Sequence, residues 1–452
     1  MKVNYLENTM RDQRSKATYQ SWGRFPKVFD QSPLRLSSRF ENLPVLNRES
    51  TFLPRGLGRS YGDSCLNAGA HLLLTRPLDH YMEFDQSTGL LRVEAGVSFE
   101  EILAFAVPRG FFLPVTPGTK FVTLGGAIAN DVHGKNHHVD GNISHHVIQF
   151  EILRSNGERL ICSPTSNQDM FYATIGGLGL TGLITWAELR LRPIHNPFIT
   201  QEVIKTTGLS DFFALSKDPE HKWNYTVSWV DCLAKNQNVG RGLYIRGNHA
   251  GAEHSKASIK SPGNKKTVPF DFPSFALSGL TVKAFNLLYY NKQFSRQTSG
   301  LTRYDPFFYP LDAIHDWNKI YGTRGFLQWQ CVVPFGDGQD SIKEILGAIS
   351  NNGQGSFLSV LKTFGDKPSL GLMSFPRPGV TLALDFPNTG EKLYRLLDRL
   401  DDITRTAKGS VYIAKDARMS PENFRLFYPR IQEFSRFVDP KFSSSFWRRV
   451  TS

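Results

Sequence analysis

Two glycine-rich stretches in the first third of the chain constrain its fold more than any other feature. The first is Arg55–Asp63, with the sequence RGLGRSYGD, and the second is Pro117–Asn136, with the sequence PGTKFVTLGGAIANDVHGKN. Glycines at this density let the backbone approach a ligand closely and turn its N–H groups toward an anion such as a diphosphate. Ordinary glycine turns are the alternative, but the interspersed Arg, Ser, Thr, Asn and His residues supply more hydrogen-bonding groups than turns require. Neither stretch reads G-x-x-x-x-G-K-[ST], so a mononucleotide P-loop is not predicted.

The length and charge of the chain limit the classes of protein to which it belongs. At 452 residues it exceeds one ordinary core, so we expect two or three domains. Its 40% hydrophobic and 21% charged residues are typical of a folded globular protein. The net charge of +12 indicates anionic partners, such as a phosphate-bearing cofactor, an acidic substrate or a membrane surface. Nucleic acid is not expected, because no helix-turn-helix, zinc-finger or RNP signature occurs.

The cysteines and the N-terminal residues bear on the compartment. Cys65, Cys162, Cys232 and Cys331 are widely spaced and form no C-x-x-C pair, so neither a metal site nor a disulfide framework is expected. Residues 1–16 contain no apolar h-region, and no later window has the apolar length of a membrane-spanning helix. We therefore expect a cytoplasmic protein.

Residues 1–195 are predicted to alternate short strands and helices and to form a first domain. Ser98-Phe99-Glu100-Glu101 is a capping box that predicts a helix through Val107, and Asn156-Gly157 predicts a hairpin. A further helix is expected over 169–175. The expected strands are 71–75, 90–94, 147–154, 159–162 and 183–192.

The stretch Gly177–Gly182 matches G-x-G-x-x-G by letter, but a helix precedes it and an alternating strand follows it. This order is the reverse of a dinucleotide-binding βαβ unit, whose helix N-terminus would hold the diphosphate. We therefore predict a tight helix-to-strand passage beside a ligand, not a Rossmann fold.

The pattern of predicted strands and helices changes after Pro193, and residues 196–409 are predicted to form an inserted α+β domain. Strands are expected over 225–231 and 325–333, and amphipathic helices over 341–350 and 391–406. Val411–Asp416 is expected to be a strand that returns the chain to the first domain, so that residues 410–452 complete it.

Residues 254–290 form a distinct segment within the inserted domain. Lys256, Lys260, Lys265 and Lys266 occur among Gly, Pro and Ser, and an aromatic, apolar stretch follows them. Lysines next to an apolar helix suit an anionic bilayer surface. A mobile loop that covers the core of the second domain is an equally weighted alternative.

Taken together, these motifs resemble FAD-dependent oxidoreductases of the vanillyl-alcohol-oxidase type, and within them the flavin subunits of polyprenyl-phosphoryl-ribose 2′-epimerases. The resemblance covers nearly the whole chain and follows the order of the family: RGLGRSYGD, the second glycine stretch continued by His137-His138, GFLQWQ, Asp385-Phe386-Pro387 and Ala414-Lys415-Asp416. It implies a two-domain, PCMH-type FAD-binding fold of the α+β class with an inserted antiparallel-sheet substrate domain.

The resemblance also implies which residues line the cofactor and the substrate. The cofactor-lining set is Arg55, Gly56, Leu57, Gly58, Arg59, Ser60, Tyr61, Gly118, Thr119, Thr123, Gly125, Gly126, Ala129, His133, Gly134, Asn136, Ile184, Tyr412 and Lys415. The substrate-facing set is Gln328, Gln330, Lys362, Lys135 and Thr381, and Tyr61 faces the same pocket.

Two departures from the family pattern matter. Many of these flavoproteins bind FAD covalently through a histidine in the first glycine stretch, but this chain has Arg59-Ser60-Tyr61 there, so dissociable FAD is expected. The strand before Asp385 reads Thr381-Leu382-Ala383 where the epimerase subunits have an Asn and a Cys. This second difference concerns the identity of the substrate, not the fold.

Four residues are predicted to take part in the chemistry: Lys415, His133, Tyr61 and Lys135. A buried Lys415 would stabilise negative charge on the reduced cofactor or on a developing alkoxide, whereas a surface lysine paired with Asp416 is the alternative. A neutral His133 imidazole would position the substrate hydroxyl. The five histidines 133, 137, 138, 145 and 146 lack a carboxylate or thiolate complement, so no metal site is predicted.

Two amides and a lysine are predicted to bind the substrate. Gln328 and Gln330 alternate around Trp329, which places both amides on one face of a strand, suited to a row of sugar hydroxyls. A solvent-facing polar strand is the alternative. Lys362 would hold a phosphate.

The sequence therefore predicts an FAD-dependent enzyme that oxidises a secondary hydroxyl of a sugar, most specifically the 2′-hydroxyl of a polyprenyl-phosphoryl pentose. Its expected partners are a separate NAD(P)-dependent keto-reductase, a quinone or dioxygen as electron acceptor, and peripheral contact with the inner membrane surface. The alternatives are a soluble aldonolactone, alditol or sugar oxidase and a non-catalytic binding protein for polyanions.

Overall fold

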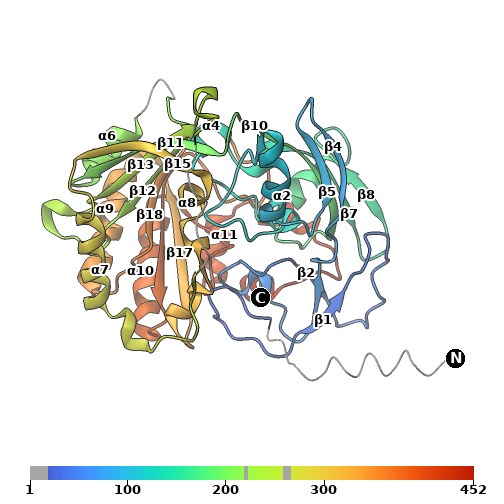
Figure 1. The fold of residues 1–452 in the computed structure, drawn as a ribbon. Helices are drawn as coiled ribbons and strands as arrows, with labels where there is room; N and C mark the ends of the chain where they lie inside the picture. The colour runs from blue at the N-terminus through green and yellow to red at the C-terminus, as the bar shows by residue number, and fades with distance from the viewer. Residues whose placement is uncertain (1–18, 218–221, 258–265) are drawn as a thin grey trace.

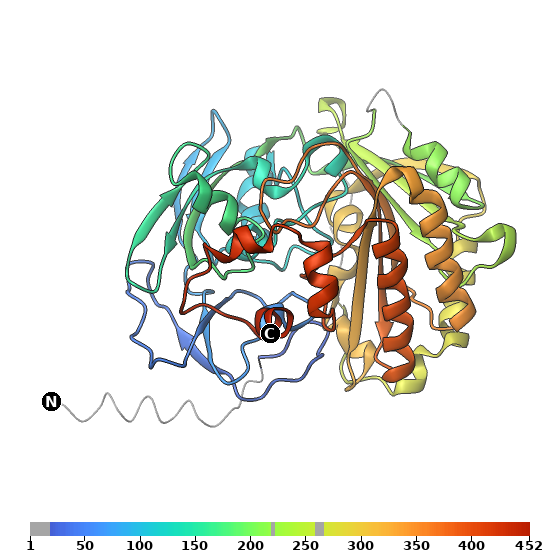
Figure 2. The ribbon, with the colours of Figure 1, turned by 180° about the vertical axis from the view of Figure 1, so that it is seen from behind.

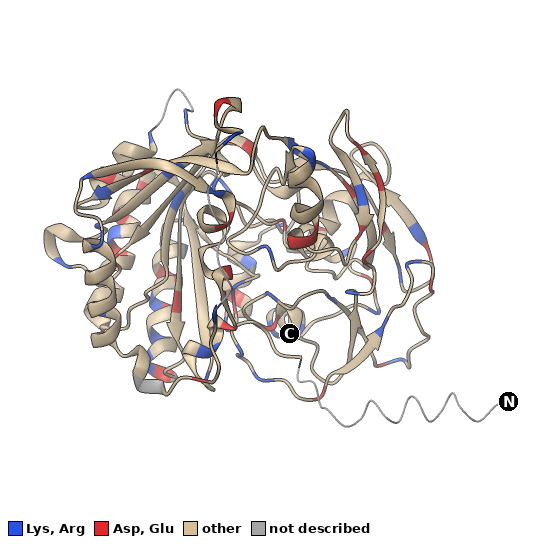
Figure 3. Ribbon diagram, viewed as in Figure 1, with Lys and Arg blue, Asp and Glu red and all other residues tan. Residues whose placement is uncertain are grey.

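The computed structural model describes residues 19–217, 222–257 and 266–452. Two large sheets occupy opposite sides of the molecule, and the chain runs from one to the other and back (Figure 1). Strand pairing within both of these sheets is antiparallel. Basic and acidic residues occur on both sides, so the excess positive charge is not confined to one of them (Figure 3).

The N-terminal part contains a three-stranded parallel sheet and a five-stranded antiparallel sheet. The first has the order β1-β3-β2 and the second the order β4-β5-β9-β7-β8. The strands are β1 (Ser32–Arg35), β2 (Phe52–Arg55), β3 (His71–Leu74), β4 (Tyr81–Asp85), β5 (Leu90–Glu94), β7 (Val147–Leu153), β8 (Arg159–Cys162) and β9 (Leu183–Arg190). Short helices lie between them: α2 (Phe99–Ala106), α3 (Leu124–Ala129), α4 (His137–Asp140) and α5 (Gln168–Thr174). A two-stranded sheet joins β6 (Phe111–Phe112) to β10 (Arg192–Pro193).

The middle of the chain forms the eight-stranded sheet, in the order β15-β11-β13-β12-β18-β19-β17-β20. The strands are β11 (Phe198–Thr206), β12 (Tyr225–Val230), β13 (Gly242–His249), β15 (Gln297–Arg303), β17 (Phe326–Val333), β18 (Ser359–Phe364), β19 (Gly379–Pro387) and β20 (Ser410–Val411). The helices of this part are α6 (Leu209–Ser216), α7 (Gly279–Asn291), α8 (Tyr304–Phe308), α9 (Phe335–Asn352) and α10 (Glu391–Thr406). A small parallel pair joins β14 (Lys266–Thr267) to β16 (Ile314–His315).

Both faces of strand β17, which lies between β19 and β20, are covered. Its outward residues, including Trp329 and Cys331, share a core with leucines of α10 and isoleucines of α9. Its inward residues, Gln328 and Gln330, are only 7% and 3% exposed. The expectation that both amides share one face is confirmed, and the alternative of a solvent-facing polar strand is wrong.

The local signals in the sequence predicted most of these elements. The capping box at Ser98 is present, with the Glu101 N–H donating to the Ser98 hydroxyl and the Glu101 carboxylate accepting from the Ser98 N–H. The hairpin at Asn156-Gly157 joins β7 to β8, and Gly157 has a φ of 87°. The helix expected over 341–350 is longer than predicted, because it begins directly after Pro334.

The strand predicted at Val411–Asp416 is wrong in its extent and in its neighbours. Only Ser410–Val411 is a strand, and it pairs with β17 of the eight-stranded sheet. The chain then turns, with the Lys415 N–H donating to the Tyr412 carbonyl over 3.0 Å. This turn matters because it carries Lys415.

The last residues run back along the N-terminal part as three short helices, α11 (Pro421–Phe427), α12 (Ile431–Ser435) and α13 (Ser445–Thr451), seen best from behind (Figure 2). Phe442 bridges β2 at Phe52, and the Ser443 N–H donates to the Phe52 carbonyl. Phe424 and Phe446 belong to the core of the eight-stranded sheet. The C-terminal segment therefore contacts both large parts of the structure.

Candidate active site

A cavity of about 780 Å³ lies between the two glycine stretches and the inner face of the eight-stranded sheet. All but one of the predicted cofactor and substrate residues line it, from Arg55–Tyr61 and Gly118–Gly134 on one side to Gln328, Gln330, Lys362 and Thr381 on the other. The exception is Asn136. It is buried behind the loop and donates to the Pro114 carbonyl and the Asp140 carboxylate, so it supports the loop and does not line the cavity.

The first glycine stretch leaves β2 and turns at Gly58, which has a φ of 61°. Arg55 lies beneath this turn, and its guanidinium donates to the carbonyls of Cys65 and Gln20 over 2.7 and 2.6 Å. Among the described residues, none accepts from the backbone N–H groups of Gly58, Arg59 and Ser60. Three consecutive free donors at the edge of a cavity suit an anionic ligand.

The second glycine stretch packs against the first. A Cβ at Gly56 would lie 2.2 Å from the Thr123 hydroxyl, which explains why that position carries a glycine. Thr123 caps α3 by accepting from the Gly126 N–H. The Thr119 hydroxyl and the Lys120 N–H both donate to the carboxylate of Asp312, which holds this loop against the residues that follow α8.

The helix-to-strand passage predicted at Gly177–Gly182 is confirmed. It connects α5 to β9, and Gly179 and Gly182 have φ values of 74° and 139°. Both glycines and Ile184 line the cavity beside the second glycine stretch.

His133 is at the centre of a hydrogen-bonded cluster that joins the loops to the sheet. The Gln330 amide donates to His133 Nε2 over 3.2 Å and to the Thr381 hydroxyl over 3.0 Å. Lys362 Nζ lies 2.9 Å from His133 Nδ1 and donates to the Gly134 carbonyl over 3.1 Å. Burial, and then the charge of Lys362, hold the pKa of His133 well below its usual range, so the ring is neutral near pH 7.

Three lysine amines share this region: Lys362 contacts the histidine, and Lys135 and Lys415 lie close enough to influence Lys362. Burial lowers the pKa of Lys135 to about 8. Burial, followed by the charges of Lys135 and Lys415, lowers the pKa of Lys362 well below its usual range. Among the described residues no carboxylate offsets these effects on Lys135 or Lys362, so neither amine has a protein counter-ion. An anionic ligand would restore the charge on both amines.

Lys415 lies on the other side of the cluster, with its Nζ 4.0 Å from the centre of the Tyr61 ring. Burial lowers the pKa of Lys415 to about 8, and the buried carboxylate of Asp385 opposes this shift. Asp385 accepts a hydrogen bond from the Gln328 amide, and its second oxygen has no partner among the described residues. Lys415 is therefore a cavity residue, and the alternative of a surface lysine paired with Asp416 is wrong, because Asp416 pairs with Arg449.

The turn that carries Lys415 is fixed by an ion pair and by several hydrogen bonds. Arg449 of α13 contacts the carboxylates of Asp63 and Asp416 over 2.7 and 2.9 Å. Asp416 also accepts from the N–H groups of Arg418 and Met419. The Tyr61 N–H donates to the Ala414 carbonyl over 3.1 Å, which joins the first glycine stretch to the turn.

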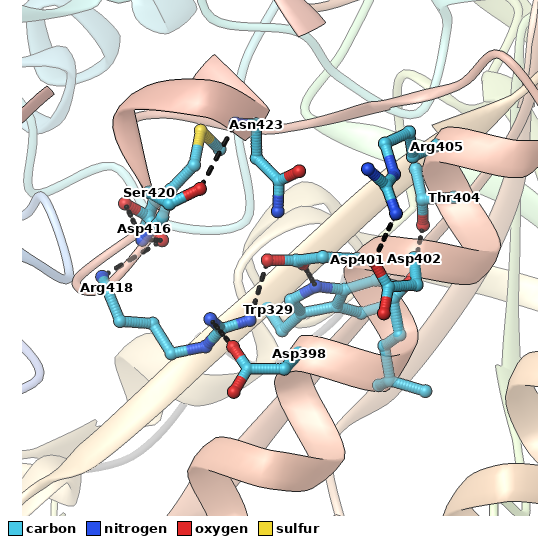
Figure 4. A network of polar contacts seen from close by, with 12 residues as sticks. Trp329, Asp398, Asp401, Asp402, Thr404, Arg405, Asp416, Arg418, Ser420 and Asn423 are labelled. Atoms are coloured by element: carbon cyan, nitrogen blue, oxygen red, sulfur yellow. Dashed lines mark hydrogen bonds and ion pairs between the residues drawn. The ribbon is translucent and has the colours of Figure 1, made fainter. Parts of the chain in front are cut away.

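A second set of contacts connects this turn to the sheet (Figure 4). Arg418 donates to Asp398 over 2.5 Å and to Asp401 over 2.6 Å. Asp401 also accepts from the indole N–H of Trp329 over 2.8 Å. Since Trp329 lies between Gln328 and Gln330, the network ties α10, β17 and the Lys415 turn into one rigid support.

Sequence reasoning missed several residues of the cavity. They are mainly aromatic or acidic and come from distant segments: Trp22, Trp229, Phe285, Tyr289, Phe307, Phe308, Asp312 and Trp317. No motif marks them, and only the pairing of strands and loops brings them to the cavity. Asp385 was visible within the Asp385-Phe386-Pro387 motif, but its carboxylate was not assigned a role.

Three histidines that follow the second glycine stretch contact protein groups. His137 Nδ1 accepts from the Gly365 N–H, His138 Nε2 lies 2.8 Å from the Trp223 carbonyl, and His146 Nε2 lies 3.2 Å from the Asp140 carbonyl. They serve as supports of the loop.

These residues fit FAD. The free N–H groups of residues 58–60 suit its diphosphate, and a Cβ at Gly118 would meet no atom within 4 Å, so this backbone faces open space. Two buried polar atoms at the cavity, the Ser64 hydroxyl and the Asn130 amide oxygen, have no partner among the described residues. Hydrogen-bonding capacity left over at a cavity is a property of a ligand site.

Comparisons with known proteins agree with this assignment. Residues 45–163 match the model of a family described as FAD binding domain. The chain is 36% identical over 413 residues to decaprenylphosphoryl-β-D-ribose oxidase of Mycolicibacterium smegmatis, and the match covers 88% of each protein. It is 30% identical over 372 residues to an uncharacterized protein in the mprA 5′ region of Streptomyces coelicolor, covering 78% of this chain and 100% of that one. Δ(24)-sterol reductase of Rattus norvegicus is 31% identical over 112 residues, which are 25% of this chain and 22% of the reductase. The chain uses FAD as its cofactor and belongs to the family of FAD-dependent oxidoreductases that includes decaprenylphosphoryl-β-D-ribose oxidase.

Proposed function

We propose that the protein oxidises the 2′-hydroxyl of a polyprenyl-phosphoryl ribose to a 2′-keto sugar, the first half of an epimerisation at that carbon. The observation that carries the proposal is the cluster at the inner end of the cavity. It places two amides, a neutral imidazole and three lysine amines within one buried site. The relative named decaprenylphosphoryl-β-D-ribose oxidase supports the choice of substrate.

Bound FAD supplies the hydride acceptor, and the residues of this chain bind, orient and exchange protons. Gln328 and Gln330 bind the sugar hydroxyls. Lys135 and Lys362 neutralise the phosphate, for which the protein provides no competing carboxylate. Neutral His133, whose two ring nitrogens contact Gln330 and Lys362, positions the reacting hydroxyl through the Gln330 amide that it holds. Lys415, charged and supported by Asp385, stabilises the negative charge that develops as the hydroxyl loses its proton.

The proposed layout divides the chain between cofactor and substrate. Residues 1–195 and 410–452 form the FAD-binding domain, and residues 196–409 form the substrate-binding domain, whose sheet β20 of the returning segment extends at one edge. The first contributes the free N–H groups of residues 58–60, and the second contributes the inner face of the eight-stranded sheet. FAD is held without a covalent bond, since Arg59-Ser60-Tyr61 offers no nucleophilic histidine or cysteine.

The protein is proposed to meet its lipid-linked substrate at a membrane surface. None of the described helices is long and apolar enough to span a bilayer. The outer side of α7 exposes apolar side chains, with Leu280 at 79% and Leu288 at 73%, and Lys256 and Lys266 are exposed nearby in sequence. Lys260 and Lys265 lie outside the described residues. Apolar and basic groups together favour peripheral contact with anionic lipid.

Two partners complete the proposed reaction. A separate NAD(P)-dependent keto-reductase would reduce the 2′-keto sugar from the opposite face, and a quinone or dioxygen would reoxidise the flavin. The cytoplasmic compartment stays a prediction of the sequence.

The test is anaerobic bleaching of the oxidised flavin. Decaprenylphosphoryl ribose is expected to bleach the wild-type protein, whereas the same lipid carrying 2-deoxyribose is expected to leave it yellow, because it lacks the reacting hydroxyl. Lys415→Met is expected to keep the bound flavin and to slow bleaching by about 10²-fold or more. Bleaching by free alditols or lactones, with none by the lipid-linked sugar, would contradict the proposal in favour of a soluble sugar oxidase.

A further inference from the structure

The inner face of the eight-stranded sheet changes from polar to apolar across the strand order. Residues directly opposite each other in paired strands have their side chains on the same face. The register places Gln330 of β17 opposite Ala383 of β19, Ala383 opposite Val360 of β18, and Val360 opposite Trp229 of β12. All four line the same cavity. One row of side chains therefore leads from the substrate amides into an apolar region.

The apolar region continues beyond this row onto the next strand. Val227, two residues from Trp229, pairs with Ile245 of β13, and both line the cavity. The Trp229 indole donates to the Phe357 carbonyl over 3.0 Å, so it presents only carbon atoms and no unsatisfied donor. Gln201 of β11 lies at the far edge, where the lining becomes polar again.

Helix α7 forms a wall of this apolar branch. Its Tyr289 ring lies 4.6 Å from the Trp229 ring, and its Phe285 ring packs edge-on against Phe357 at 5.6 Å. Phe285 and Tyr289 line the cavity, yet Phe285 is still 43% exposed. The branch therefore reaches solvent beside α7, next to the exposed Leu288.

We propose that this branch, lined by Val227, Trp229, Ile245, Phe285 and Tyr289, binds the first isoprenoid units of the lipid that carries the sugar. The inference rests on the proposed function. With the sugar at Gln328 and Gln330 and the phosphate at Lys135 and Lys362, the chain that leaves the phosphate enters the apolar branch and exits beside α7. FAD does not compete for this space, because its diphosphate is assigned to residues 58–60, on the opposite wall of the cavity.

An apolar chain in this branch has a measurable consequence for binding. Each buried methylene group favours the bound state, so the Michaelis constant must depend on the length of the lipid. The polar contacts to the sugar and phosphate are the same for every chain length. The dependence of the Michaelis constant on lipid length therefore arises from the apolar branch, and it is expected to disappear when the branch is made polar.

The experiment uses the FAD-loaded protein and three phosphodiester substrates with the same head group: methylphosphoryl ribose, geranylphosphoryl ribose and decaprenylphosphoryl ribose in detergent. Anaerobic flavin reduction gives the rate and the half-saturating concentration for each. In the wild-type protein we expect the half-saturating concentration to fall by at least about tenfold between methylphosphoryl ribose and geranylphosphoryl ribose. The limiting reduction rate is expected to stay the same.

Ile245→Gln places an amide in the branch, and Ile161→Gln on β8 is the matched control at a 38% exposed site of the other sheet. We expect Ile245→Gln to raise the half-saturating concentration of the two lipid-linked substrates by about tenfold and to leave that of methylphosphoryl ribose unchanged. Ile161→Gln is expected to match the wild type. An equal effect on all three substrates would overturn the inference.

If Ile245→Gln does not fold, the half-saturating concentrations of the three substrates in the wild-type protein still test whether the branch binds lipid. Equal half-saturating concentrations for the three substrates would overturn the assignment of the branch and leave the proposed oxidation intact. Flavin that stays oxidised with all three would contradict the proposed function, and with it the lipid-binding role of the branch.

Discussion

Gly62 lies where the first glycine stretch touches the turn that carries Lys415, and its replacement by alanine tests how tightly the two must pack. A Cβ at this position would lie 1.7 Å from the Asp416 carbonyl oxygen and 2.9 Å from Ala417 Cα. Both are backbone atoms and cannot rotate away. Gly62 has a φ of −110°, which alanine adopts readily, so the effect of Gly62→Ala comes from this contact and not from backbone strain.

The expected loss of rate and stability in Gly62→Ala follows from the 1.7 Å between the added Cβ and the Asp416 carbonyl oxygen. To reach the 3.4 Å of an ordinary contact, the two segments must separate by about 1.7 Å. A displacement of about 1 Å in an active site costs about 10²-fold in rate. We therefore expect flavin reduction by Gly62→Ala to slow by at least about 10²-fold, together with a loss of about 1–3 kcal/mol in the free energy of unfolding from overpacking.

The assay is stopped-flow bleaching at saturating substrate, with flavin content and thermal unfolding measured on the same samples. Gly347→Ala in α9 is the matched control, since its Cβ would meet no atom within 4 Å. It should leave the rate unchanged and raise stability by about 1 kcal/mol through helix propensity. A wild-type rate in Gly62→Ala would refute the claim that the Tyr61 and Lys415 segments must be held in this contact.

Three further predictions concern the supports and the charges of the site. Arg449→Gln leaves the buried carboxylates of Asp63 and Asp416 without their shared cation and should lower the free energy of unfolding in urea by about 3 kcal/mol. The control Arg395→Gln should lower it by about 0.5 kcal/mol or less, because its partner Glu391 is exposed. Similar losses in the two variants would contradict the role of Arg449 in the network. Because burial lowers the pKa of Lys135 to about 8, its charge is present below that pH and is lost above it, so the KM for a phosphate-bearing substrate should rise between pH 7 and pH 9. Lys135→Arg should flatten this profile, and a flat wild-type profile would argue against a phosphate at this lysine. Trp329→Phe removes the N–H that donates to Asp401 and should lower the free energy of unfolding by about 1–3 kcal/mol. The limiting rate of flavin reduction should change little, because the indole faces away from the cavity. A large loss of rate at unchanged stability would contradict that orientation.

Short-range signals made the fold largely predictable. The capping box at Ser98, the hairpin at Asn156-Gly157 and the alternation around Trp329 each depend on neighbouring residues alone, and the structure confirms all three. The glycine stretches were informative for the same reason. Gly58 has a positive φ, and Gly56 lies too close to Thr123 to carry a side chain. Glycine meets both requirements, so the residue type itself indicated them.

The parts that could not be predicted depend on contacts between distant segments. Val411–Asp416 looks like a strand, but hydrogen bonds from Tyr61 to Ala414 and from Arg449 to Asp416 hold most of it as a turn. Asp312 supports the second glycine stretch from almost two hundred residues away in sequence, at 2.7 Å from Thr119. The apolar branch became visible only when strand register placed Trp229 in the same row as Gln330.

The most direct test of the account is a crystal structure of the yellow, FAD-loaded protein. The diphosphate is expected to accept hydrogen bonds from the N–H groups of residues 58–60, and the redox ring is expected to lie against His133 and Lys415 with no covalent bond to the chain. A diphosphate bound elsewhere, or a ring placed among Val227, Trp229 and Tyr289, would contradict it.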